Sequence, residues 1–387
     1  MDIRTIKEAD FSGKRAIVRV DFNVPIDSSG NITDDNRIKE ALPTIRYILD
    51  KGAKQVVLMS HLGKPKGPDP KLRMDNVAKR VQELLKIDVA KVDDCIDVAL
   101  PSAKVVMLEN LRFHAEEEKN DPKFAEKLSK YADIYVNDAF GTCHRAHASV
   151  HAITKYLPSY AGLLVEKEAV TMGKALENPE HPFVAIMGGS KVSDKIEVIQ
   201  NLLPKVDYLL IGGAMMFTFY KSIGFETGKS LVENDKLGLA ASLIKDRKII
   251  IPEDAVVAEK ADDSSAMRNV PLSAIPKHMI GLDIGANTIG SYKAIIEKAK
   301  TIIWNGPMGM FEIKRFAKGT EEIAKAVADA TQKNNAVSII GGGDSAAAID
   351  ELGLKDKVTH VSTGGGASLE FFAGKALPGI AVLKKTK

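Results

Sequence analysis

Three polar side chains alternate where a short apolar run near the start of the chain ends. Arg19, Asp21 and Asn23 occupy every second position after the apolar residues 16–18. Successive side chains of a strand point to opposite faces, so these three would share one face, and Pro25 stops the ladder. Open α/β sheets bind ligands at the carboxyl ends of their strands. The run therefore predicts a ligand site, with a salt-bridged strand end as the alternative that these residues leave open.

Basic side chains recur after the successive β-branched runs in the first half of the chain. In chain order they are Arg37, His61, Lys64, Arg112, His144, Arg145 and His147. Sequential parallel strands would place these residues along one edge of a sheet, where they could converge. Arginine forks match the oxygens of carboxylates and phosphates. This pattern predicts a pocket for a small, strongly anionic substrate.

Two other patterns in the first half are interpreted without a ligand. The three glutamates at 116–118 are expected to form the solvated start of a helix. Cys143, His144 and His147 carry the side chains of metal ligands, but the sequence has no second ligand pair to match them. No metal is therefore predicted there.

Glycine-rich turns follow three strand-like runs in the second half, at 188–189, 212–213 and 341–343. Glycine pairs let backbone N–H groups approach a ligand closely. The N-terminus of a following helix adds partial positive charge, which suits phosphates. A fourth helix N-terminus is expected at the glycines 364–366. The four turns together predict a nucleotide site.

Charged side chains beside these turns extend that prediction. Lys191 and Lys195 are four positions apart, and they share one helical face if the helix begins at the 188–189 turn. Such a like-charged pair is mildly unfavourable unless an anion lies between its members. Asp344 is an oxygen donor of the kind that holds Mg²⁺. The sequence contains no P-loop and no protein-kinase motif set, so phosphoryl transfer would need another design.

Short apolar runs alternate with longer helical patterns, and these are the elements that must position the residues above. Strands are expected at 16–20, 55–60, 104–108, 132–137, 183–187, 206–211, 248–251, 301–304, 336–340 and 358–361. Helices are expected at 37–51, 74–85, 122–131 and 162–176. Alternating βα units predict mainly parallel sheets covered by helices. A chain of 387 residues is too long for one ordinary core, so two domains are expected.

Bulk composition excludes several classes of protein. The chain is 45% hydrophobic and 27% charged, as soluble globular proteins are. Its net charge is only +3, which argues against a nucleic-acid partner. No apolar run approaches the roughly 20 residues that span a membrane, and the first residues have no apolar signal region. Two cysteines cannot form a disulfide framework, so a reducing cytoplasm is the expected location.

Seven segments together resemble the phosphoglycerate kinase family over essentially the whole chain. In order they are RVDFNVP at 19–25, SHLGK at 60–64, LENLRF at 108–113, NDAFGTCHRAH at 137–147, GGSKVSDK at 188–195, NGPMGMFE at 305–312 and GGGDS at 341–345. The resemblance implies two Rossmann-like, three-layer α/β domains joined by a helix hinge. Residues 1–165 would bind 3-phosphoglycerate and residues 166–370 the nucleotide, with about 371–387 packing back on the first domain.

The resemblance also implies the activity of a phosphotransferase with a carboxyl group as acceptor. Phosphoryl would pass reversibly between ATP and 3-phosphoglycerate, giving ADP and 1,3-bisphosphoglycerate in glycolysis and gluconeogenesis. Mg²⁺ would arrive as Mg-ATP or Mg-ADP, and the enzyme would be a cytoplasmic monomer. The attacking carboxylate is already ionised at neutral pH, so catalysis reduces to alignment and charge stabilisation.

Site residues follow from the resemblance position by position. Phosphoglycerate would be held by Asp21, Asn23, Arg37, His61, Lys64, Arg112 and Arg145. The nucleotide would be held by Lys191, Lys195, Gly213, Gly285, Asn305, Glu312, Gly342, Gly343, Asp344 and Ser345, with Asp344 also holding Mg²⁺. The transferring phosphoryl would be surrounded by Arg37, Lys191 and Lys195 and by the helix N-termini at Gly343 and Gly366.

Two positions depart from the family pattern. Lys64 stands where the family usually has Arg, which removes a two-pronged contact, and Ser345 replaces a more usual Thr but keeps the hydroxyl. Two other classes of protein share some of these features. A dinucleotide-dependent oxidoreductase fits the glycine spacing at 341–346, but the next strand lacks the acid that would hold a ribose. A two-lobed binding protein would need neither the two lysines nor Asp344.

Overall fold

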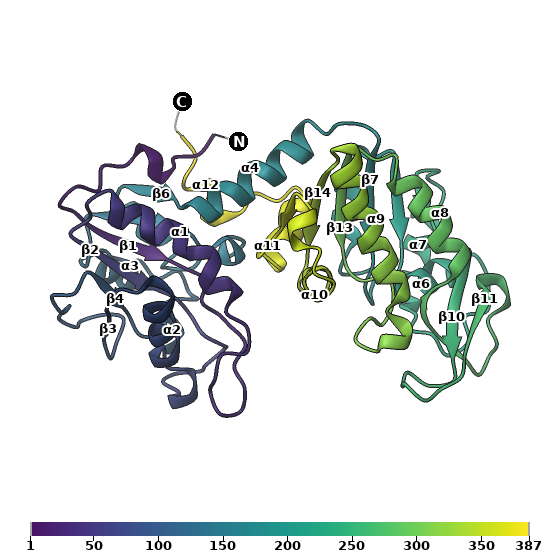
Figure 1. Cartoon of the computed structure of the whole chain (residues 1–387), viewed down its shortest axis with the longest axis horizontal. Coiled ribbons are helices and arrows are strands. Elements are labelled where there is room, and N and C mark those ends of the chain that lie inside the picture. Colours follow the sequence, from purple (N-terminus) through teal and green to yellow (C-terminus); the bar gives the residue numbers. More distant parts are fainter. Residues whose placement is uncertain (1, 386–387) are drawn as a thin grey trace. The chain divides into compact units, whose positions relative to one another are not determined.

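The computed structural model describes residues 2–385 of the chain. The chain divides into two compact units, which are Met1–Val170 with Ala376–Lys387, and Thr171–Lys375. The first division lies inside the helix α4 (Leu163–Glu177), and the second follows Lys375. They were expected at 165/166 and 370/371. Each unit is built around its own parallel sheet (Figure 1).

The first unit holds a six-stranded sheet in which every pairing is parallel. Its strands are β1 (Arg15–Arg19), β2 (Gln55–Met59), β3 (Val89–Lys91), β4 (Val105–Met107), β5 (Ile134–Asn137) and β6 (Ser159–Ala161). Their order is β3-β4-β2-β1-β5-β6. In register, Ala16 of β1 lies between Val56 and Ile134. The strand that leads into Asp21 and Asn23 is therefore central.

Helices cover both faces of this sheet (Figure 1). Val18 of β1 packs in a core with α1 (Asn36–Asp50) and α2 (Asp75–Leu85). Its neighbour Ile17 packs in the opposite core, with α3 (Pro122–Ser129) and the 3-10 helix η5 (Ala152–Lys155). Alternate side chains of one strand thus serve two cores. This explains why the strands of a covered parallel sheet are apolar without interruption.

The second unit is built around another six-stranded parallel sheet. Its strands are β7 (Phe183–Met187), β8 (Tyr208–Ile211), β9 (Ile249–Ile250), β13 (Thr301–Asn305), β14 (Val337–Gly341) and β15 (His360–Val361), in the order β15-β14-β13-β7-β8-β9. Its helices after α4 are α5 (Ile196–Leu202), α6 (Met215–Ser222), α7 (Leu237–Leu243), α8 (Ala286–Ile296), α9 (Lys318–Asn334), α10 (Gly343–Glu351) and α11 (Gly366–Phe372).

A three-stranded antiparallel sheet is added to the second unit, and the sequence did not predict it. Its strands are β10 (Asp254–Ala258), β11 (Met267–Pro271) and β12 (Ile280–Ile284), with β10 in the middle. β11 is exposed along most of its length, so it lacks the apolar alternation by which strands are recognised. This small sheet bears on the site because β12 supplies part of a pocket wall.

Two mainly parallel sheets with helices on them confirm the predicted α/β fold class. Every expected strand and helix is present, and their ends lie within two residues of the expected ones. One local prediction is wrong. The helix after the 188–189 turn begins only at Ile196, so Lys191 and Lys195 precede it and do not share a helical face.

The two ends of the described chain meet in the first unit. Ile3 forms a β-bridge with Lys384, and the backbone N–H of Arg4 donates to the carbonyl of Leu383 at 2.8 Å. The short helix α12 (Pro378–Ala381) precedes this contact. Among residues 2–385, no helix combines the length and the apolar character that crossing a membrane requires.

Candidate functional site

The loop after β1 is tied to the next elements at the carboxyl edge of the first sheet. Arg37, in the first turn of α1, forms an ion pair with Asp21, with Nη1 2.6 Å from Oδ2. Asn23 Oδ1 accepts a hydrogen bond of 2.8 Å from the backbone N–H of Gly63. The strand itself ends at Arg19, so the expectation that all three polar side chains share one strand face is wrong.

Arg112 approaches the same place from β4. It lies on the 3-10 turn η3 (Leu111–Phe113), where Asn110 accepts from its backbone N–H at 3.1 Å. Its Nη1 donates to the carbonyl of Gly63 at 2.7 Å. Arg112 and Asn23 therefore both bind Gly63, two positions after His61, and the loops after β1, β2 and β4 converge on one point.

Positive charge accumulates at this point. His61 is 4% exposed, and its pKa is lowered well below the usual range by burial and by the nearby Arg19, Arg112 and Arg37. Burial and Arg19, Arg112 and Arg145 lower the pKa of His147 to about 3. Both imidazoles are therefore neutral at pH 7. The predicted residues that meet here are Asp21, Asn23, Arg37, His61, Arg112 and Arg145. We refer to them as the basic pocket.

Two residues predicted to bind phosphoglycerate have exposed side chains: Arg145 of the basic pocket, and Lys64 at its margin. Lys64 follows Gly63 and its side chain is exposed. Arg145 is also exposed, and its Nε donates to His144 Nε2 at 3.1 Å. Both side chains can therefore adjust to a bound anion.

A buried network lies beneath the basic pocket. Arg19 is 1% exposed, its Nε donates to Ser149 Oγ at 2.9 Å, and its Nη2 is 3.1 Å from His61 Nδ1. The Ser149 hydroxyl donates to Glu117 Oε1 at 2.5 Å. Burial raises the pKa of Glu117, which Arg19 opposes. Glu116 and Glu118 are exposed, but Glu117 is fully buried and the segment forms turns, so the expectation of a solvated helix start at 116–118 is wrong.

The network fixes the tautomer of His61. A guanidinium can only donate hydrogen bonds, so His61 Nδ1 must be the acceptor. A neutral imidazole then carries its proton on Nε2. The sequence places Arg19 at the site, but it does not show that Arg19 donates a hydrogen bond to His61.

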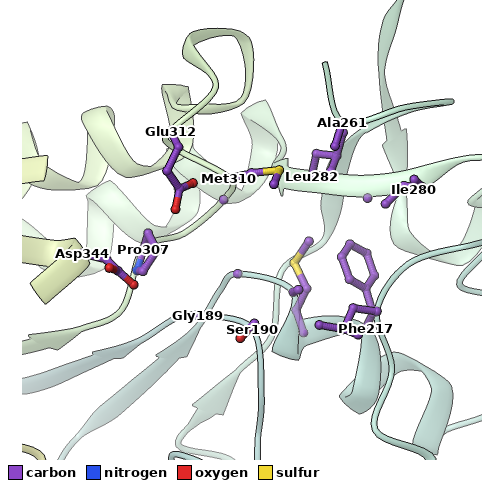
Figure 2. Close-up of a pocket in the computed structure, with 16 residues that line it drawn as sticks. Gly189, Ser190, Phe217, Ala261, Ile280, Leu282, Pro307, Met310, Glu312 and Asp344 are labelled. Atoms are coloured by element: carbon purple, nitrogen blue, oxygen red, sulfur yellow. The ribbon is translucent and has the colours of Figure 1, made fainter. Parts of the chain in front are cut away.

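The second unit contains a pocket of about 400 Å³. Figure 2 shows the carboxylates of Glu312 and Asp344 at one side of it and the apolar side chains of Phe217, Ile280 and Leu282 at the other. Ile280 and Leu282 come from β12. An apolar wall with a few polar groups at one end is typical of a small-molecule site. Of the predicted residues, Gly213, Glu312 and Asp344 line this pocket.

The glycine turns at 188–189 and 212–213 form the floor by packing on one another. The N–H of Gly189 donates to the carbonyl of Pro307 at 2.9 Å, and that of Gly213 donates to the carbonyl of Met308 at 2.8 Å. A Cβ on Gly213, whose φ is +65°, would lie 2.4 Å from the backbone N of Gly189. These N–H groups are committed within the protein, in contrast to the expectation that they face a ligand.

The turn after β14 is more open. Gly342 has a φ of +94°, and Gly343 begins α10 with no atom within 4 Å of where its Cβ would stand. Gly366 begins α11, and a Cβ on the preceding Gly365 would have no atom within 4 Å. The first N–H groups of a helix lack partners within the helix, and they favour a phosphate. Asp344 lies in the first turn of α10, at the edge of the pocket.

Lys195 contacts Asn305, whose side-chain amide forms a hydrogen bond through its oxygen but not through its nitrogen among the described residues. Its Nζ donates to Asn305 Oδ1 at the end of β13. Asn305 is fully buried, and its Nδ2 has no hydrogen-bond partner among the described residues. Burial lowers the pKa of Lys195, whereas Asp194 and Asp344 raise it. Lys191 is exposed. An ammonium group and an unpaired amide donor beside an oxygen ligand fit the phosphates and metal of a Mg-nucleotide.

Two predicted nucleotide residues have evident packing roles. Ser345 is fully buried, and its Oγ accepts from the N–H of Gly306 at 2.7 Å. Gly285 is absent from the residues that line the pocket, and a Cβ there would lie 2.2 Å from Asp254 Cγ. Gly285 thus permits close packing at the start of α8.

The residue that anchors the loop between Lys191 and Lys195 was not predicted from the sequence. Glu233 accepts from the backbone N–H of Ser193 at 3.0 Å and from its hydroxyl at 2.5 Å. Leu231, two positions earlier, lines the pocket. The segment containing Glu233 therefore links the pocket wall to the loop between Lys191 and Lys195. No spacing rule joins residues so far apart, so the sequence carries no signal for this contact.

Comparisons with known proteins agree with this geometry. A family model described as phosphoglycerate kinase matches residues 6–375. A phosphoglycerate kinase of Dictyoglomus turgidum is 56% identical, over 99% of this chain and 98% of its own length. A cytosolic phosphoglycerate kinase of Triticum aestivum is 52% identical, over 98% of each chain.

Solved structures agree as well. Phosphoglycerate kinase from Coxiella burnetii aligns with a TM-score of 0.88 at 37% identity, and that from Pyrococcus horikoshii with 0.86 at 35%. Both alignments cover 98% of each chain. The chain belongs to the phosphoglycerate kinase family. It is therefore a kinase that transfers a phosphoryl group between ATP and phosphoglycerate, the reaction of that family in glycolysis.

Proposed function

We propose that the basic pocket of the first unit binds 3-phosphoglycerate and that the 400 Å³ pocket of the second unit binds ATP or ADP. The observation that carries the first assignment is the convergence of the loops after β1, β2 and β4, which brings the positive charges of Arg37 and Arg112 close to His61. Such an excess of positive charge is relieved by a small anion. The unpaired Asn305 amide beside Lys195 and Asp344 supports the second assignment.

Within the basic pocket, we assign each residue to the part of the substrate that its chemistry suits. Arg37, Arg112 and Arg145 supply guanidinium forks for the phosphate and carboxylate of the substrate. His61 donates through Nε2, because Arg19 occupies its Nδ1. Asp21 and Asn23 contact the single hydroxyl group of 3-phosphoglycerate and orient Arg37 and the Gly63 turn. Lys64 gives a single ammonium contact at the margin.

In the second unit, the apolar wall of Phe217, Ile280 and Leu282 receives the base, and Glu312 accepts from the ribose. Lys191, Lys195 and the N–H groups at the start of α10 hold the phosphates. Asp344 holds Mg²⁺ with the nucleotide. When bound, that ion neutralises charge on the phosphate oxygens. Gly285 and Ser345 support the site through packing rather than through contact with the nucleotide.

Transfer requires alignment more than proton chemistry. A carboxylate oxygen of 3-phosphoglycerate attacks the γ-phosphorus, the bond to the β-phosphate oxygen breaks, and ADP leaves with that electron pair. No proton is moved, so no general base is needed. The negative charge of the transferring phosphoryl group is stabilised by Arg37, Lys191 and Lys195, together with the helix N-termini at Gly343 and Gly366.

The two substrates are held by different units, so the units must bring the reacting atoms to about 3–3.5 Å from each other. The chain passes between the units inside α4 and again near Lys375. We place the hinge in α4 and near Ser362 and Thr363. Closure would also keep water from taking the phosphoryl group.

The enzyme is further proposed to be a monomer of the cytoplasm without a nucleic-acid partner. A relative from Triticum aestivum is named as cytosolic, and the net charge of this chain is only +3. Light scattering of the purified protein would test the first point.

A coupled assay of ADP formation tests the assignment directly. We expect ADP to form from Mg-ATP only when 3-phosphoglycerate is added. ADP formation without 3-phosphoglycerate would indicate a simple ATPase. Binding of reduced nicotinamide without ADP formation would support an oxidoreductase. The matched protein control is Lys298→Ala, which removes an exposed lysine of the second unit and should leave the rate unchanged.

A further inference from the structure

Three side chains of metal-binding type meet in the first unit, apart from the residues assigned to phosphoglycerate. One ligand atom each from Asp94, Cys95 and His114 lies within 4.8 Å of the other two. His114 Nε2 is 2.7 Å from Asp94 Oδ1. Cys95 is fully buried, whereas the side chains of His114 and Asp94 are 26% and 45% exposed. The cluster therefore lies where the core meets the surface.

We propose that this Asp94–Cys95–His114 cluster binds a thiophilic divalent cation of the Zn²⁺ class. Thiolate sulfur, imidazole nitrogen and carboxylate oxygen are the three ligand types of protein zinc sites. Three protein ligands leave a fourth position for water, and the exposed side of the cluster can supply it. Mg²⁺ prefers oxygen ligands and would not be taken in place of such a cation. On binding, the thiol proton passes to solvent and no electron is transferred.

The three ligands are held in place by the protein. The His114 ring packs against Phe124, with centroids 5.4 Å apart. The backbone N–H of Cys95 donates to Asp94 Oδ1 at 2.6 Å, which fixes the carboxylate beside the thiol. Cys95 itself belongs to the apolar core with Leu108 and Leu111. A cation would thus find its sulfur ligand in a dry, ordered position and its other two ligands at the rim.

The surrounding charge favours a cation. Asp97 and Glu116 act electrostatically on the same Lys127 as Asp94 does. Lys127 is itself paired with Asp97 at 2.5 Å. The charge of Lys127 is therefore already matched by Asp97, and Glu116 adds negative charge near the cluster beside Asp94.

A bound cation would cross-link two segments that lie far apart in the sequence. Asp94 and Cys95 lie in the loop after β3, whereas His114 caps η3 and its N–H donates to Leu111 at 3.2 Å. Occupancy should therefore raise the thermal stability of the protein, because a ligand that binds only the folded state stabilises it.

Co²⁺ is the probe for the test, since thiolate ligation gives it a near-ultraviolet charge-transfer band. Full-length protein without added Mg²⁺ is titrated with Co²⁺. We expect one equivalent to produce the band and Zn²⁺ to displace it. Cys95→Ser should abolish the band. The matched control is Cys143→Ser, because Cys143 is the other buried cysteine and has His144 and His147 beside it in the sequence.

Two further variants keep the test decisive if Cys95→Ser does not fold. Asp94→Asn and His114→Gln change half-buried side chains, and each should weaken Co²⁺ binding by at least about tenfold. The wild type and Cys143→Ser should gain thermal stability with Zn²⁺, and His114→Gln should not. The proposal is overturned if wild-type protein gives no thiolate band. It is equally overturned if Cys143→Ser removes the band, or if both rim variants bind Co²⁺ as the wild type does.

Discussion

Removal of the Lys195 side chain is the sharpest test of the nucleotide site. The ammonium group of Lys195 contacts buried Asn305 next to the pocket, and the nearby Asp344 raises the pKa of Lys195. We expect Lys195→Ala to lower kcat by roughly 10²–10³, the loss seen when one preorganised electrostatic donor is removed, or about 2.7–4 kcal/mol. KM for ATP should change less, because the apolar wall of the pocket is untouched.

The same change has two opposing effects on folding. Asn305 Oδ1 loses its donor, and an unsatisfied buried polar group costs about 1–3 kcal/mol. The folded protein also no longer has to bury an ammonium group, whose pKa is lowered by that burial. The two terms largely offset each other. A net change near 1 kcal/mol would move Tm by about 2–4 °C in a domain of this size.

Steady-state rates of ADP formation and thermal unfolding are to be measured on three proteins. These are the wild type, Lys195→Ala and the exposed-lysine control Lys298→Ala. The reasoning requires a large loss of kcat with a small shift of Tm in Lys195→Ala alone. A kcat within about threefold of the wild type would remove Lys195 from the transition state. A Tm lowered by more than about 10 °C would show that the protein needs the Lys195–Asn305 contact in order to be stable.

Three other results are expected. Lys64→Arg should lower KM for 3-phosphoglycerate at unchanged kcat, because a fork can make two contacts where an ammonium makes one; a large fall in kcat would contradict this. Asp138 is fully buried, and burial raises its pKa from an ordinary 3.8 to about 7, so its contribution to stability is complete below pH 3.8 and is lost as the pH rises to about 7. Asp138→Asn, whose carbonyl can still accept from the N–H of Leu164, should remove about 4 kcal/mol of that pH dependence in denaturant titrations, and an unchanged slope would count against it. Small-angle scattering should give a smaller radius of gyration with both substrates than with either alone, and identical curves would exclude closure as the gating step.

Much of the fold could be predicted because its strands are covered on both faces. Runs such as 56–59 and 183–187 are fully buried, so they appear in the sequence as unbroken apolar stretches. Three of the strands that were missed lack this signal. β3 and β6 have only three residues each, and β11 is largely exposed. Short or solvated strands depend on their neighbours more than on their own pattern.

The basic pocket could be anticipated because it depends on topology. Polar residues that follow parallel strands gather at one edge of the sheet, so Arg37, His61 and Arg112 could be grouped before their contacts were known. The support beneath them could not. Glu117 stands in a run of acids that resembles a solvated surface, and only the fold brings it to Ser149 and Arg19. Pairings across such distances leave no period in the sequence.

The glycine turns also show how far the sequence can predict a contact. Glycine at 189 and 213 indicated close approach, which is correct, but what approaches is another turn of the protein. Gly306 repeats this, since a Cβ there would lie 2.3 Å from the carbonyl oxygen of Gly188. Composition can show that a backbone must come near something, but it cannot show what that partner is.

Both pockets have polar or charged groups whose partners are incomplete in the free protein, and this affects how the enzyme would respond to its substrates. The first brings together more arginines than carboxylates, and next to the second lies the buried Asn305 amide donor, which has no partner among residues 2–385. Each arrangement costs stability in the free protein, because unmatched charge and unsatisfied polar groups are unfavourable when buried. An anion that matches either pocket removes that cost. Each substrate should therefore stabilise the unit that binds it before any closure occurs, which separates binding from the later alignment of the two reacting atoms.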